Sequence, residues 1–177
     1  MVVQLQLSEK SNLGKPISNQ MPSNKDWGPY LWTFLHGIAE KLGRQSSEII
    51  ASDEAREITL VLRCVESVMP CEKCRMHYHD YLKKNPIDDF PQKRGEHLRQ
   101  SVRMWLWRLH EAVNERNGVG SFPVEQLTPT YENAALSDAY STFLSVVSRA
   151  LTNGLVSSEK VKSFRRHVSF LRGILGT

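Results

Sequence analysis

Apolar residues recur every three or four positions along most of the chain from Asp26 onward, which is the spacing of one buried face of an α-helix. The first two stripes are Leu31, Leu35, Ile38 and Leu42, and then Val61, Cys64, Val65 and Val68. The Met69-Pro70 step interrupts the pattern, because proline lacks the amide hydrogen and disfavours a helical residue before it. The pattern therefore predicts that one helix ends there and that another begins at Pro70 or Cys71 and runs to about Lys84.

The rest of the chain continues this helical pattern. A loop at 87–95, which follows Pro86 and contains Pro91, separates the third segment from a fourth, predicted from about Glu96 to Arg116 and ended by Asn117-Gly118. Two further amphipathic segments begin near Leu136 and Val161. No β-rich segment follows residue 25, so we predict an all-α fold.

Composition limits the class of protein. A chain of 177 residues with 40% hydrophobic and 24% charged residues is long enough for one ordinary core. Its 23 basic and 19 acidic residues are mixed along the chain, which disfavours a nucleic-acid binder. No apolar run reaches the roughly 18 residues of a membrane span, and the polar N-terminus does not resemble a signal peptide. We expect a soluble, intracellular protein with a flexible tail at 1–24.

Two of the three cysteines form the sequence Cys71-Glu72-Lys73-Cys74 at a predicted helix start. Exposed amides and the helix dipole stabilise a thiolate there, so a redox-active disulfide is chemically plausible. Zinc is the competing interpretation because His77 and His79 follow closely. On one helix, however, these side chains point in scattered directions and cannot converge on one ion, so we expect no metal. Cys64 lies on an apolar stripe and is interpreted as a small buried hydrophobe.

Aromatic and imidazole side chains lie beside two of the predicted apolar stripes. Trp32 and His36 are four residues apart on the first helix, and Trp107, His110 and Asn114 share a face of the fourth. Each residue alone is more typical of packing, but together they suit a flat heteroaromatic ligand that is stacked on one side and hydrogen-bonded at its edge. This arrangement favours a bound cofactor.

Three motifs occur in the order and spacing of one known family: Trp27-Gly28-Pro29-Tyr30-Leu31-Trp32-Thr33-Phe34-Leu35-His36, Pro70-Cys71-Glu72-Lys73-Cys74, and Leu109-His110-Glu111-Ala112-Val113-Asn114. The chain thus resembles the Erv/ALR family of FAD-linked sulfhydryl oxidases over roughly 27–131, and most of all the versions encoded by large DNA viruses. The resemblance implies a four-helix bundle with a short fifth helix at 25–131, and usually a homodimer. Residues 132–177, which contain the two additional amphipathic segments, have no counterpart in the family core, so we predict that they form a C-terminal helical extension. A viral source would place the protein in the host cytoplasm or the virion.

The resemblance also implies roles for single residues. Cys74 would be the thiol next to the flavin and Cys71 the outer thiol that exchanges with substrate. Electrons would pass from protein dithiols, for example in a thioredoxin-like carrier, through FAD to dioxygen, giving hydrogen peroxide. The expected FAD contacts are Gly28, Trp32, His36, Trp107, His110, Asn114 and Tyr131.

The chain departs from the family pattern at several positions. Many members have Arg at the position of Pro29, Asn at that of Glu111 and a basic residue at that of Val119, and a common structural disulfide would join the positions of Trp107 and Val124. A second cysteine pair, the shuttle of many cellular members, is missing. A non-catalytic helical interaction protein that keeps the fold without FAD therefore stays open as the alternative, with a flavin-free zinc module third.

Overall fold

The computed structural model describes residues 22–177 and confirms the all-α prediction, because these residues form seven α-helices and two short 3-10 helices without a strand. The predicted flexible tail at 1–24 falls almost wholly outside the described residues. The helices are α1 (Asn24–Lys41), α2 (Glu48–Val68), α3 (Glu72–Lys84), η1 (Phe90–Gln92), α4 (Gly95–Arg116), η2 (Val124–Gln126), α5 (Leu127–Tyr131), α6 (Leu136–Thr152) and α7 (Ser158–Leu175).

Local sequence signals explain where the first three helices begin and end. Ser23 and Asp26 form a capping pair at the start of α1, where the Ser23 amide donates to the Asp26 carboxylate over 2.7 Å. Helix α2 ends at Val68, directly before the Met69-Pro70 step. Helix α3 then starts at Glu72 with Cys71 as its N-cap residue. The proline therefore separates two helices and puts the cysteine pair at a helix start.

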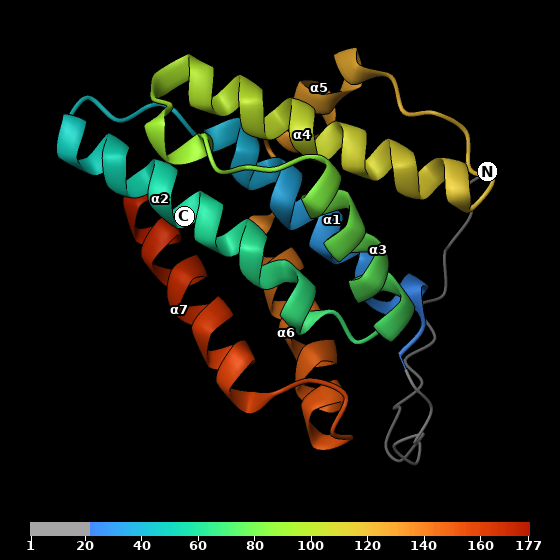
Figure 1. The fold of residues 1–177 in the computed structure, drawn as a ribbon. Helices are drawn as coiled ribbons and strands as arrows, with labels where there is room; N and C mark the ends of the chain where they lie inside the picture. Colours follow the sequence, from blue (N-terminus) through green and yellow to red (C-terminus); the bar gives the residue numbers. More distant parts are fainter. Residues whose placement is uncertain (1–21) are drawn as a thin grey trace, which may run out of the picture.

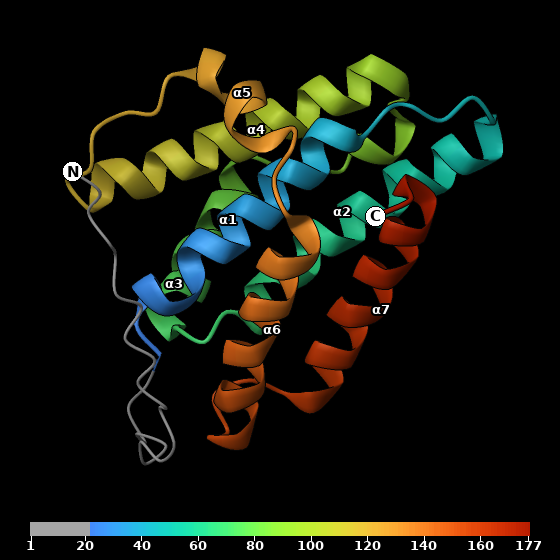
Figure 2. The same cartoon turned by 180° about the vertical axis from the view of Figure 1, so that it is seen from behind.

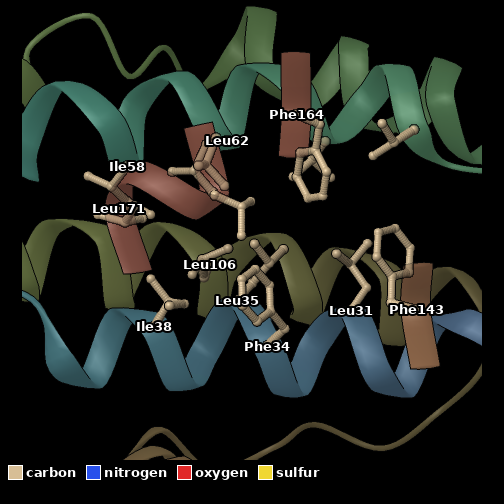
Figure 3. Close-up of a cluster of buried hydrophobic side chains, with 14 of the residues drawn as sticks. Leu31, Phe34, Leu35, Ile38, Ile58, Leu62, Leu106, Phe143, Phe164 and Leu171 are labelled. Carbon is tan, nitrogen blue, oxygen red and sulfur yellow. The ribbon is translucent and has the colours of Figure 1, made fainter. Parts of the chain in front are cut away.

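One hydrophobic core joins all the long helices (Figure 3). Helix α1 packs against α4 and α6, while α2 packs against α3 and α7. In Figure 1, α6 and α7 lie below α1 and α2, whereas α4 lies above them. Phe143 of α6 and Phe164 of α7 are fully buried and contact each other edge-on at a ring distance of 6.2 Å. Since 25–131 and 132–177 share this core, the boundary between an oxidase domain and an extension stays a prediction.

Gly37 lets the segment after α5 lie directly on α1. A Cβ atom at this position would collide with the Leu136 side chain and lie 3.3 Å from the Tyr131 carbonyl oxygen. The missing side chain thus brings Tyr131 next to α1, as Figure 2 shows for α5 and the chain that follows it. Among the described residues, no helix combines the length and apolarity that a membrane crossing requires.

Candidate active site

Cys71 and Cys74 form a disulfide at the start of α3, with their Cα atoms 5.2 Å apart. The Cys71 sulfur accepts a hydrogen bond from the Cys74 amide over 3.2 Å, as an N-cap side chain does. Both residues are only half buried. After reduction, the free amides of the first turn stabilise a thiolate here. The pair is therefore accessible to a substrate and has a sulfur that is activated for thiol exchange.

Contacts from other helices hold this disulfide. The Cys74 sulfur lies 3.3 Å from the side-chain oxygen of Asn24, in the first turn of α1. Arg75 donates to the Met69 carbonyl over 2.7 Å and to the Leu155 carbonyl, between α6 and α7, over 3.3 Å. The disulfide therefore has a fixed orientation, with Cys74 facing α1.

A stripe of residues four positions apart leads along α1 away from Cys74. It consists of Asn24, Gly28, Trp32 and His36, and this spacing puts all four on one face of the helix. At 1.5 Å per residue the stripe is about 18 Å long. A Cβ atom at Gly28 would meet nothing within 4 Å, so the chain leaves open space beside this turn. The α1 stripe joins the cysteine pair to an aromatic cluster.

The aromatic cluster consists of Trp32, His36, His110 and Tyr131. The rings of Trp32 and His110 stack with centroids 4.0 Å apart and planes within 11°. His36 stacks on Tyr131 at 4.6 Å, and its Nε2 atom lies 3.2 Å from Nδ1 of His110. Helices α1, α4 and α5 thus supply parallel ring faces at the end of the stripe.

Both imidazoles in the cluster are uncharged at neutral pH. Burial lowers the pKa of His36 to about 3, with smaller contributions from His110 and from the positive charge of Arg103. Burial also lowers the pKa of His110 to about 4. A neutral imidazole has one donor and one acceptor nitrogen, so the pair can share a proton in one hydrogen bond. The cluster is therefore a neutral aromatic surface.

Trp107 and Asn114 lie on the same helix as His110 but hold the loop after α4. The Trp107 indole donates to the Phe122 carbonyl over 2.8 Å, and the Asn114 amide donates to Glu111 over 3.0 Å. Glu111 also accepts from the Phe122 amide over 2.9 Å. These bonds secure the loop near Val124, where many family members have a disulfide.

Of the residues predicted as FAD contacts, the structure brings Trp32, His36, His110 and Tyr131 together, and it puts Gly28 on the stripe between them and Cys74. Sequence reasoning missed Asn24 and Gly37. For Asn24 a signal existed, because it extends the same four-residue spacing backwards by one turn.

These residues fit a ligand with flat aromatic ring systems, such as flavin adenine dinucleotide. The cluster offers ring faces, Trp32, His110 and Tyr131 are partly exposed, and none of its four side chains is charged at neutral pH. Besides burial, the positive charges of Arg116 and Lys73 lower the pKa of His77, so basic groups gather near the start of α3. Such charges suit phosphate groups.

Comparison with known proteins gives a consistent result. The model of the Erv1/Alr family matches residues 29–132. A protein of Acanthamoeba polyphaga mimivirus, named as a probable FAD-linked sulfhydryl oxidase, is 33% identical over 54% of this chain and 62% of its own. The FAD-linked sulfhydryl oxidase of Arabidopsis thaliana is 26% identical over 59% of this chain and 49% of its own.

An African swine fever virus protein with the same name is 29% identical over 51% of this chain and 66% of its own. The chain thus spans between about half and two thirds of the length of these relatives. No solved structure matches the chain significantly.

Proposed function

Because this chain belongs to the Erv1/Alr family, we propose that it is an FAD-dependent sulfhydryl oxidase that forms disulfides in protein thiols. The observation that carries this proposal is the position of the Cys71–Cys74 disulfide. It is partly exposed at a helix start and adjoins a stripe that leads to a neutral aromatic cluster. A purely structural bundle has no need of this combination.

The two cysteines divide the thiol exchange between them. A substrate thiolate attacks the Cys71 sulfur, the bond to Cys74 breaks, and its electron pair leaves with Cys74 as a thiolate. A second substrate thiolate then attacks the mixed disulfide and releases Cys71. The substrate has lost two electrons and two protons, and both cysteines are reduced. The contact between Cys74 and Asn24 supports this assignment, because it turns Cys74 toward the α1 stripe.

Residues of this chain would hold FAD along the stripe. When bound, FAD accepts two electrons from the cysteine pair and passes them to dioxygen, giving hydrogen peroxide. The open space beside Gly28 is where the ligand can approach α1 closely, and Trp32, His36, His110 and Tyr131 offer ring faces beyond it. Trp107 and Asn114 would act through the loop after α4.

The substrate is a protein dithiol, for example in a thioredoxin-like carrier. Beyond the redox pair, the chain has one cysteine, Cys64, which is free and half buried on α2. It has no partner for a shuttle pair within this chain, so a substrate would have to reach Cys71 directly. We also propose an intracellular setting, the host cytoplasm or the virion if the source is viral. The hydrogen bond that Trp107 donates to the Phe122 carbonyl and the one that Glu111 accepts from the Phe122 amide secure the loop after α4 without a structural disulfide, which supports that setting.

We propose in addition that the chain forms a homodimer through a surface of α2 and α7. Phe170 is 53% exposed and Ile50 is 43% exposed, and both line one pocket with Ile174. Asp53 and Arg166 line the same pocket with opposite charges. In a twofold interface Asp53 of one copy can face Arg166 of the second copy, and Arg166 can face Asp53. The surface is therefore complementary to itself in charge.

The test of the oxidase function is the visible absorption spectrum of the purified protein, recorded under air before and after a dithiol is added. We expect a flavin band that bleaches and recovers while peroxide forms. In Cys74→Ser the flavin should stay bound and peroxide formation should stop, whereas Cys64→Ser, the matched control, should behave as the wild type. A colourless protein that takes up no added FAD would refute the proposal in favour of a non-catalytic interaction protein.

A further inference from the structure

A closed network of three polar side chains joins α1, α4 and α5 one turn beyond the aromatic cluster. Arg103 of α4 donates to one carboxylate oxygen of Glu40 over 2.6 Å and to the Thr128 hydroxyl over 2.9 Å. The Thr128 hydroxyl in turn donates to the other Glu40 oxygen over 3.0 Å. The Glu40 and Arg103 side chains are only 4% and 15% exposed, so both charges are paired out of solvent.

This network continues the surface that leads from Cys74. Glu40 follows His36 by four residues, so it extends the α1 stripe by one more turn. Thr128 and Tyr131 belong to the same short helix, and Tyr131 stacks on His36 at 4.6 Å. The network therefore adjoins the end of the stripe that is farthest from the cysteines.

Helix α5 depends on such contacts for its position. It has five residues, too few for a stable helix without tertiary support. Figure 2 shows it beside α1 and α4, the two helices that the network joins. Gly37 makes room for the Tyr131 backbone, but the Thr128 hydroxyl is what ties α5 to both helices by hydrogen bonds. Loss of this hydroxyl would free Tyr131 from its place over His36.

We propose that the network of Glu40, Arg103 and Thr128 positions Tyr131 for the adenine end of FAD, and that Thr128 is thereby a positioning residue that favours the dinucleotide over FMN. The inference rests on the proposed oxidase function. To take electrons from Cys74, the flavin ring would lie beside this residue, so the rest of a dinucleotide would extend along the stripe toward Tyr131. FMN, which lacks the adenylate part, would end before the network. Glu40 neutralises Arg103, which suits an uncharged ring better than a phosphate.

The experiment measures the affinity ratio of FAD to FMN by equilibrium exchange on the full chain, starting from the holoprotein and separating the bound flavins. Thr128→Val keeps the shape of the side chain but removes both hydroxyl hydrogen bonds. We expect the ratio to fall about 3- to 10-fold, the loss of one well-placed aromatic stack. Thr130→Val on the same helix is the matched control, since Thr130 is exposed, and it should leave the ratio unchanged. Thr128→Ser should restore the wild-type ratio.

A merely structural role of Thr128 would lower the affinities for FAD and FMN by the same factor, and this result would overturn the proposal. A ratio in Thr128→Val within twofold of the wild type would do the same. If Thr128→Val fails to fold, Tyr131→Leu tests the same end of the site, and an unchanged ratio there refutes the proposal. In the double variant Thr128→Val/Tyr131→Leu we expect no further loss beyond Tyr131→Leu alone. A wild type that binds neither flavin contradicts the oxidase function itself; one that binds both equally contradicts only this inference.

Discussion

The two histidines of the aromatic cluster should make the protein less stable at mildly acidic pH. In the folded chain the pKa of His36 lies at about 3 and that of His110 at about 4, whereas the ordinary value is 6.5. Unfolding therefore takes up protons below about pH 6.5, and the folded state loses stability as the pH falls from there toward the folded pKa values. Above that pH the full stability is present.

The size of the effect follows from these values. For His36, the shift from 6.5 to about 3 gives a loss of about 2 kcal/mol between about pH 7.5 and about pH 5. His110 is partly exposed and shares a hydrogen bond with His36. We therefore expect its contribution to the loss of stability to be well below that of His36. Burial raises the pKa of Glu54. Protonation of Glu54 below that raised pKa therefore stabilises the folded state and opposes the loss of stability caused by the histidines. We therefore compare variants instead of relying on the wild type alone.

The assay is urea unfolding of the purified protein at several pH values across this range. Wild-type stability should fall with a slope that approaches about 1.4 kcal/mol per pH unit for each proton taken up. His36→Gln should lower the stability at pH 7.5 and flatten the slope by roughly one proton. His97→Gln changes an exposed histidine of α4 and should keep the wild-type slope. An identical slope in His36→Gln and the wild type would refute the reasoning.

Three further predictions concern the core, the loop after α4 and the proposed dimer. Phe143→Ala should lower the free energy of unfolding by about 3–5 kcal/mol because the ring is fully buried, whereas Met76→Ala, at an exposed position of α3, should change it by less than about 0.5 kcal/mol; urea unfolding measures both. Glu111→Gln should cost about 1 kcal/mol, since the charged acceptor of the Phe122 amide is lost at a partly exposed site, and a wild-type midpoint in thermal unfolding would contradict this. Phe170→Glu should halve the molar mass measured by light scattering, while an unchanged dimer would rule out the α2 and α7 surface.

Sequence reasoning predicted those features that depend on neighbours along the chain. The helix start at Cys71 follows from Pro70, and the pairing of Trp32 with His36 follows from a spacing of four residues. The same spacing also includes Asn24 and Glu40, so it could have predicted the whole stripe. Periodicity locates a face of a helix, and it locates every residue on that face.

The features that escaped prediction depend on contacts between distant segments. Arg103 is 63 residues from Glu40 and 25 from Thr128, and no local pattern pairs them. The orientation of Trp107 depends on the path of the loop that brings Phe122 to its indole, and a loop path has no period. A carboxylate at position 111 departs from the family pattern in the sequence, and its use as an acceptor for that loop becomes visible only in the fold.

Helices α6 and α7 lie outside the residues that match the family model, yet their contacts help to position the site. The α1 stripe occupies one face of helix α1. On another face Phe34 stacks on Tyr140 of α6, with ring centroids 4.9 Å apart. Helix α6 thus fixes the helix that carries Trp32 and His36, and the turn after α6 binds Arg75 beside Cys74. Both ends of the stripe therefore depend on contacts that the matched region does not supply alone. The extension is better understood as a part of the functional unit than as an appendage to it.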